Sequence, residues 1–404
     1  MTHARFLSQL NQKIFRWSLA FLPFVNWIGI WGLLIVIVLV VKQQGNQLLL
    51  PQTNKAILLI GILLIISCFT AYKPLESAIQ LANFLPLFLL FAILPFLLQT
   101  TVQLEQLAVS LIAISLPISS FGIIEFISGR TRPASVFENP NTLASYLVVI
   151  LGIELGLLLH ILTQKKSKLL FDVFPCRSFY ISWWQRFLIL NLIICLSLGA
   201  LLISGSRNGL LSMAIQILIF IFILGALIKQ NPIFLFSSLG ILIITGNLIG
   251  RWLGTSRHMS LQEFVSDPDR IEIWRVAFSL IQERPLFGWG LGSYINLYPL
   301  RSMTTEHFAH PHNFWLLLAS EAGFPVMFGL TTLAGYICYQ GIQVLLFEQA
   351  DLSRHWLLLG YLLAFSGCTS FALFDCTFYD IQVNVTNWLV LACIYKYVEL
   401  ELRV

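Results

Sequence analysis

Apolar residues occur along this chain in long runs that short polar stretches separate. Most runs hold roughly 18–25 residues, which is enough for a helix to cross a bilayer core of about 30 Å. Backbone groups inside lipid must be hydrogen-bonded internally, so these runs are expected to be α-helices. The expected segments are 17–41, 56–72, 75–99, 104–127, 141–161, 187–204, 210–228, 233–250, 313–340, 356–374 and 380–398. The pattern predicts an all-α polytopic transmembrane helix bundle.

The composition supports the same class. Hydrophobic residues make up 57% of the 404 residues and charged residues 11%, whereas soluble domains have about 25% charged residues. We therefore expect one integral membrane domain over 1–404, with an uncleaved N-terminus. The net charge of +5 is scattered over loops, so no nucleic-acid partner is indicated.

The distribution of charge predicts the orientation. The loop 162–186 carries five basic residues and one acidic residue, which places it in the cytoplasm by the positive-inside rule. Residues 128–140, 204–209 and 251–312 then fall on the outer side. The basic N-terminus falls inside only if 17–41, which contains Pro23, forms two short or re-entrant passes. The expected total is then about 11–12 helices.

The extracytoplasmic segment 251–312 is the longest polar part of the chain. Within it, 269–284 places four apolar residues on one helical face: Ile273, Val276, Ala277 and Leu280. This spacing predicts an amphipathic helix that lies on the outer membrane surface or over a cavity.

Three of the seven histidines lie at the end of this segment, at His307, His310 and His312. A histidine titrates near neutral pH and can take a proton from a hydroxyl. A single histidine near a helix end is more often structural, but this cluster adjoins Asn313 and precedes Glu321. His310 can assist His312 or only shape the turn at Pro311, and His307 is expected at the surface.

Arginines occupy three other places on the expected outer side. Arg130 and Arg132 lie beside an Asn-Pro-Asn turn that ends at Asn141. Arg207 lies in a turn too short to reach far into solvent, where the alternative is a snorkelling arginine that anchors a helix end. Arg270 lies in the surface helix, where a solvated charge is the alternative.

Together these residue types suit one kind of chemistry. Arginine forks match phosphate oxygens, and a histidine can act as base on an acceptor hydroxyl. A diphosphate leaving group neutralised by arginines needs no metal, so no metal and no cofactor are expected. His-x-His at His310 and His312 is a weak zinc signal without a carboxylate or cysteine alongside. The glycine-rich run at 288–293 lacks dinucleotide-binding spacing, and we interpret it as a tight turn with close backbone packing.

The chain resembles the O-antigen ligase / O-antigen polymerase superfamily of bacterial polytopic membrane proteins. Five matching pieces occur in family order: FENPNTLA at 137–144, SGSRNG at 204–209, DRIEIW at 269–274 with RPLFGWGLGS at 284–293, HN at 312–313, and EAG at 321–323.

The resemblance implies an inverting, metal-independent enzyme. Such an enzyme moves a glycan from undecaprenyl diphosphate to a hydroxyl acceptor, a lipid or a glycan, at the periplasmic face of the bacterial inner membrane. Residue by residue, it implies that Arg207, Arg270 and Arg132, or else Arg130, bind the diphosphate and that His312 is the base. The first hypothesis is a ligase of lipopolysaccharide biosynthesis, and the alternative is an O-antigen or exopolysaccharide polymerase.

A third hypothesis belongs to another class of protein, the transporters. Relatives described as bicarbonate transporters share several of these motifs and a late Leu-Phe-Asp turn, here residues 373–375 followed by Tyr379. Those relatives tend to lack the histidine that this chain keeps at His312, which favours a transferase. A transport path would need polar residues within helices, with these candidates: Glu125, Asn191, Glu154 and Asp375.

Overall fold

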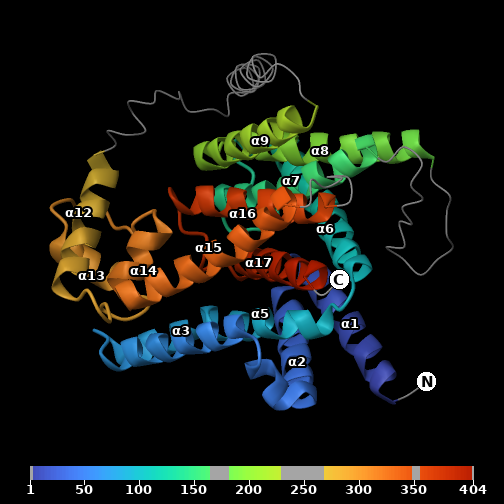
Figure 1. Cartoon of the computed structure of the whole chain (residues 1–404). Helices are drawn as coiled ribbons and strands as arrows, with labels where there is room; N and C mark the ends of the chain where they lie inside the picture. Colours follow the sequence, from blue (N-terminus) through green and yellow to red (C-terminus); the bar gives the residue numbers. More distant parts are fainter. Residues whose placement is uncertain (1–2, 164–181, 229–267, 348–354, 403–404) are drawn as a thin grey trace.

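The computed structural model describes residues 3–163, 182–228, 268–347 and 355–402. Every regular element in these ranges is helical (Figure 1), which confirms the all-α prediction. The first half of the described chain holds these helices: α1 (His3–Phe21), α2 (Asn26–Gln44), η1 (Gly45–Leu49), α3 (Gln52–Phe69), α4 (Pro74–Gln80), η2 (Leu81–Asn83), α5 (Leu85–Leu97), α6 (Thr101–Ile127) and α7 (Pro140–Thr163). The second half holds α8 (Trp183–Ile203), α9 (Arg207–Ile228), α12 (Pro268–Glu283), α13 (Tyr294–Arg301), α14 (Phe314–Ala322), α15 (Phe324–Phe347), α16 (Trp356–Ala372) and α17 (Ile381–Glu401).

Six helical stretches of the described chain are long and apolar enough to cross a membrane. They are Asn26–Leu49, Gln52–Phe69, Pro74–Leu97, Thr101–Ile127, Pro140–Thr163 and Trp183–Ile203, and two shorter apolar helices are Arg207–Ile223 and Trp356–Ala372. Large apolar side chains remain exposed on them, such as Leu59 on α3 and Leu188 on α8. Apolar surface of this extent suits contact with lipid, and the protein is a multi-pass membrane protein.

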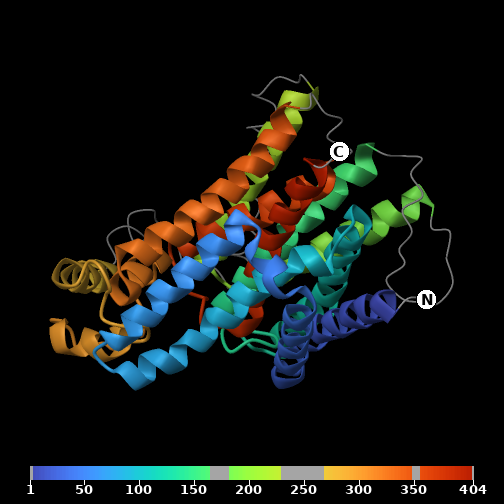
Figure 2. The same cartoon turned by 60° about the horizontal axis from the view of Figure 1, so that its bottom comes forward.

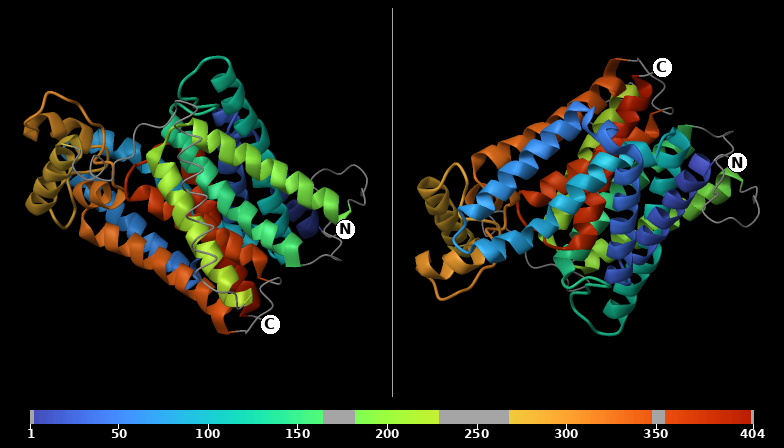
Figure 3. Two further views of the ribbon diagram at one scale, coloured as in Figure 1. Left: turned by 90° about the horizontal axis from the view of Figure 1, so that it is seen from above. Right: turned by 90° about the horizontal axis from the view of Figure 1, so that it is seen from below.

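Helices α7 and α16 lie side by side at the centre of the bundle (Figures 1 and 3). A Cβ added at Gly152 would lie 2.5 Å from the Cα of Ala364, and one added at Gly156 would lie 2.5 Å from the Cα of Gly360. The residue pairs run in opposite directions along the chain, so the helices are antiparallel. Small residues allow this close approach, which brings the start of α7 to the end of α16.

Helices α12 and α13 lie at one end of the bundle, beyond the start of α14 (Figures 1 and 2). The predicted apolar face of α12 is buried: the side chains of Ile273, Val276, Ala277 and Leu280 are at most 1% exposed. They pack in a small core with residues of α13 and α14, such as Tyr298. The amphipathic helix is thus confirmed, and its apolar face meets protein.

The expected segment boundaries need three corrections. Segment 17–41 is divided at Pro23 as expected, but its first helix begins at His3 and is not among the candidate spans. Segment 75–99 is three consecutive pieces, α4, η2 and α5. Segment 313–340 is interrupted at Gly323, whose φ of 85° is left-handed. Segment 233–250 and residues 251–267 lie outside the described residues.

The break at Gly323 has a visible cause. The backbone at Leu286 lies against the Cα of Gly323, where a side chain would clash, and Phe324 N donates to Pro285 O at 2.8 Å. Nearby, Gly288 and Gly290 adopt positive φ values of 62° and 95°. The tight, closely packed turn predicted for 288–293 is therefore confirmed.

Candidate active site

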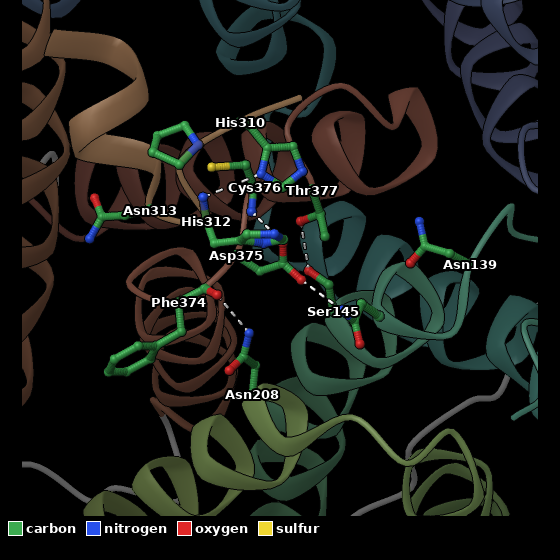
Figure 4. A network of polar contacts seen from close by, with 12 residues as sticks. Asn139, Ser145, Asn208, His310, His312, Asn313, Phe374, Asp375, Cys376 and Thr377 are labelled. Carbon is green, nitrogen blue, oxygen red and sulfur yellow. Dashed lines mark hydrogen bonds and ion pairs between the residues drawn. The ribbon is translucent and has the colours of Figure 1, made fainter. Parts of the chain in front are cut away.

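Four segments distant in sequence meet near the start of α7 (Figure 4). They are the first turn of α7, the first turn of α9, the loop that ends at His312, and the loop between α16 and α17. The antiparallel packing of α7 on α16 explains the first contact, because α16 ends where α7 begins. Ser145 Oγ on α7 lies 3.0 Å from Thr377 Oγ1 in the α16–α17 loop.

His312 has an unusual backbone conformation. Its φ is 49°, in the left-handed region that side chains other than glycine seldom adopt. Asn313 follows as the N-cap of α14: its Oδ1 accepts from Leu316 N at 2.9 Å, and its Nδ2 donates to Leu373 O at 3.0 Å. The helix start is therefore fixed to the α16–α17 loop, and the strain is borne by the residue before it. Backbone strain of this kind concentrates at functional sites.

The side chain of His312 pairs with Asp375. Its Nδ1 lies 3.1 Å from Asp375 Oδ1, with 31% of the histidine side chain and 6% of the aspartate side chain exposed. Burial by itself raises the pKa of Asp375. The hydrogen bond and charge of His312, with smaller contributions from His310 and Cys376 N, lower the pKa by more than burial raises it, so the net shift is downward. An ionised carboxylate only accepts hydrogen bonds. In the neutral ring of His312, Nδ1 therefore carries the proton and Nε2 keeps a lone pair.

Asp375 is held from its other side as well. Asn141 Nδ2 donates to Asp375 Oδ2 at 2.9 Å, and Cys376 N donates to Oδ1 at 2.8 Å. Arg132 joins the same chain of bonds, since its Nη2 donates to Asn141 Oδ1 at 3.3 Å and its Nε to Ser204 O at 3.2 Å. The two predicted residues Arg132 and Asn141 are thus connected to His312 through Asp375.

Arg207 is the first residue of α9. The next residue, Asn208, is buried, and its Nδ2 donates to Phe374 O at 2.8 Å (Figure 4). This bond places the start of α9 beside the residue that precedes Asp375. Arg207 therefore lies at the edge of the network, at a helix N-terminus that favours anions.

Arg270 lies one turn before Trp274 on α12. Trp274 Nε1 donates to Pro311 O at 3.0 Å, which ties α12 to the residue before His312. Residues four apart share one helix face, so Arg270 is on the face that meets the histidine loop.

His310 packs directly on His312. The ring centroids are 4.5 Å apart at 77°, and His312 N donates to His310 Nδ1 at 3.3 Å. Burial lowers the pKa of His310 to about 4, helped by the charge of His312 and opposed by Asp375. His310 is thus neutral near pH 7. His307 is exposed, as expected.

Two other predicted site residues bond outside this network. Arg130 is exposed and forms an ion pair with Glu125 at 2.6 Å. Glu321 is 2% exposed and accepts from Tyr294 N at 3.0 Å and from the Tyr379 hydroxyl at 2.9 Å. These bonds hold α13, α14 and the α16–α17 loop together, so Glu321 supports the frame around the site.

A cavity of about 1220 Å³ adjoins the network. Its walls come from α9, α14, α15, α16 and α17 and are mostly apolar. Asp375, Cys376 and Thr377 line it together with Phe314, the first residue of α14. The His312–Asp375 pair therefore lies beside a large apolar space, a common arrangement in ligand sites.

Asp375 is the site residue that the sequence did not assign. The sequence indicates Asp375 only as a candidate for a transport path and as part of the Leu-Phe-Asp turn. It indicates Asn208 only as part of the motif at 204–209. Nothing local in the sequence pairs either of them with residues 60 or more positions away.

Fold and site together define a multi-pass membrane protein whose histidine–aspartate pair and arginine-bearing helix starts lie beside an apolar cavity. Residues 190–331 match the family model described as O-antigen ligase. Over these residues the chain is similar to that family, and the match supports membership in the O-antigen ligase superfamily and a membrane glycosyltransferase-like role. A search of the curated proteins finds no match.

Proposed function

We propose that this protein is an inverting, metal-independent glycan transferase. It moves a glycan from undecaprenyl diphosphate to a hydroxyl acceptor at the periplasmic face of the inner membrane, as an O-antigen ligase-like enzyme. The observation that carries the proposal is the His312–Asp375 pair at 3.1 Å beside the apolar cavity. An O-antigen ligase family implies a lipid-linked glycan and an acceptor as substrates in general terms.

The histidine is the base in this proposal. Nε2 of His312 takes the proton of the acceptor hydroxyl while that oxygen attacks the anomeric carbon. The bond between the anomeric carbon and the diphosphate oxygen breaks, and the configuration inverts. The imidazolium that forms is stabilised by the ionised Asp375, which also fixes the tautomer.

The arginines neutralise the leaving group. Arg207 at the start of α9 adds its charge to the positive end of the helix dipole. Arg270 adds a second charge from the face of α12 that meets the histidine loop. Arg132 adds a third from the hydrogen-bond network of Asp375. Guanidinium groups placed where charge develops lower the barrier without a metal. The apolar cavity accommodates part of the isoprenoid chain.

The test uses purified protein in nanodiscs and a polyprenyl-diphosphate-linked glycan donor. His312→Ala is expected to lower kcat by roughly 10²–10⁴-fold through loss of the base. Arg270→Ala is expected to lower kcat/KM by roughly 10²-fold. His307→Ala, in the same loop with an exposed ring, is the matched control. Full activity in both site variants would overturn the mechanism.

The polymerase alternative shares the donor and the site, and differs only in using a second glycan unit as acceptor. The transporter alternative is less well supported, because its candidates bond to separate partners. Glu125 Oε2 accepts from Ala134 N and Ser135 N, while Glu154 accepts from Ser197. Uptake of labelled bicarbonate into vesicles that contain the purified protein would revive it.

A further inference from the structure

The histidine cluster contains more ligands than the proposed transfer uses. His310, His312 and Asp375 each offer one ligand atom, and these atoms lie within 4.8 Å of one another. The sequence offered only His-x-His, and the fold supplies the missing carboxylate. We propose that these three residues form a binding site for a divalent transition metal of the Zn²⁺ type, and that the bound metal inhibits the protein.

The distances suit a tetrahedral ion. Ligands about 2.0–2.2 Å from tetrahedral zinc lie roughly 3.4 Å from one another. His312 Nδ1 and Asp375 Oδ1 are already 3.1 Å apart. The ring of His310 lies 4.5 Å from that of His312, centroid to centroid. All three ligand atoms lie within 4.8 Å of one another, so a shift of the His310 ring by at most about 1.4 Å completes a three-ligand set.

The backbone and the outer contacts prepare this set. The left-handed φ of 49° at His312 turns its ring onto that of His310, two residues earlier. Asn141 Nδ2 holds the second oxygen of Asp375 at 2.9 Å, which orients the carboxylate in the way that outer partners orient metal ligands. Two imidazoles and one carboxylate favour Zn²⁺, Co²⁺ or Ni²⁺ over Mg²⁺ or Ca²⁺. The fourth position is left for water, since Asp375 lines the cavity.

Inhibition follows from the tautomer of His312. In the metal-free pair the proton is on Nδ1, and Nε2 is the basic atom. A metal that binds Nδ1 requires the ring proton to be on Nε2, and this exchange moves one proton within the ring through solvent with no net release. Nε2 then has no lone pair and cannot accept the hydroxyl proton. This second half of the inference rests on the proposed function, whereas metal binding itself does not.

Binding is tested first, without any activity measurement. Titration of the full-length protein in nanodiscs with Zn²⁺ is expected to give one site, and Co²⁺ is expected to give visible d–d absorption typical of a tetrahedral site. His310→Ala is expected to weaken Zn²⁺ affinity at least about 10-fold, and His310→Asn provides a second variant if the first does not fold. His307→Ala, three residues earlier and exposed, is the matched control and should bind as the parent does.

Equal affinity in the His310 variants and in His307→Ala would overturn the site, as would an octahedral Co²⁺ spectrum. Inhibition is then measured as the Zn²⁺ concentration that halves each variant's own metal-free rate. A His310 variant should need at least about 10-fold more Zn²⁺, and a chelator should restore the rate. Zn²⁺ that binds but leaves transfer unchanged or faster would overturn inhibition, and an inactive metal-free protein would instead count against the proposed function.

Discussion

At the scale of single residues, the site depends on one carboxylate with several partners. Asp375 accepts from His312, Asn141 and Cys376 N, so it orients the histidine and joins it to the arginine network. Asp375 is largely buried. An asparagine in its place would keep the shape of the side chain and lose its charge. The residue scale therefore yields two predictions, one on catalysis and one on pH.

Asp375→Asn is expected to lower kcat for glycan transfer by roughly 10²-fold or more. The amide cannot stabilise the imidazolium of His312, and its NH₂ group can donate to Nδ1 and so favour the tautomer in which Nε2 carries the proton. Steady-state kinetics with a fixed acceptor measures the effect. Asp380→Asn is the matched control: Asp380 Oδ1 caps α17 by accepting from Gln382 N and Val383 N, and Asn caps equally well. Equal losses in both variants would refute a positioning role for Asp375.

His310 makes stability depend on pH. Its pKa falls from 6.5 to about 4, chiefly because burial disfavours the charged ring. Between pH 6.5 and 4, His310 is therefore protonated in the unfolded chain and neutral in the folded protein. The free energy of unfolding has its full value, as far as His310 is concerned, above pH 6.5, and it decreases by up to roughly 3 kcal/mol as the pH falls toward 4.

His310→Gln is therefore expected to lose less thermal stability than the parent between pH 6.5 and 4. The midpoint of thermal denaturation in detergent, measured across this range, tests it. His307→Gln is the control from the same loop. If both variants follow the pH curve of the parent, the burial argument for His310 fails.

At the scale of elements, the packing of α7 on α16 positions the site. Both helices carry small residues at the contact, with Gly152 and Gly156 on α7 facing Ala364 and Gly360 on α16. The antiparallel contact sets which loops meet. Without it, Asn141 at the start of α7 would not reach Asp375 just beyond the end of α16.

Gly156→Ala is expected to destabilise the protein by about 1–3 kcal/mol and to lower activity, because the added Cβ would lie 2.5 Å from the Cα of Gly360. Thermal denaturation and transfer rate are measured together. Gly335→Ala on α15, where no heavy atom lies within 4 Å of the new Cβ, is the control for thermal denaturation and should leave the stability unchanged or slightly higher. A neutral Gly156→Ala would mean that the two helices can separate freely.

At the scale of the whole molecule, α9 and the last four helices, α14 to α17, line the cavity of about 1220 Å³. Its walls are mostly apolar, while the site residues Asp375 and Thr377 lie on its lining. A lipid-linked donor has the same division, with an apolar chain and a polar head. The arrangement therefore allows a chain in the cavity and a diphosphate at the arginines.

Ala334→Trp on α15 is expected to fill part of this cavity and to raise KM for a long-chain polyprenyl donor by roughly 10-fold, while a short-chain donor is affected less. Leu59→Trp on α3 is the control, because Leu59 is 59% exposed and lies outside the cavity lining. Kinetics with donors of two chain lengths separates the cases. Equal changes for both donors would mean that the cavity does not hold the lipid.

The sequence by itself determined the class of protein and the types of residue at the site. Long apolar runs can only be helices in lipid, and polar residues between such runs stand out: His312, Arg207, Arg270 and Arg132. It also predicted the buried face of α12 and the tight turn at 288–293, because periodicity and glycine content are local signals. The break at Gly323 escaped it, since the cause is the backbone of a distant loop.

Only the tertiary structure decided which of these residues meet. Asp375 lies 63 positions from His312 and 234 from Asn141, and no periodicity connects positions so far apart. Their contact follows from the close antiparallel packing of α7 on α16 and from the left-handed backbone at His312. The cavity is likewise a property of several helices at once, because its shape depends on how closely they approach and not on the composition of any one of them.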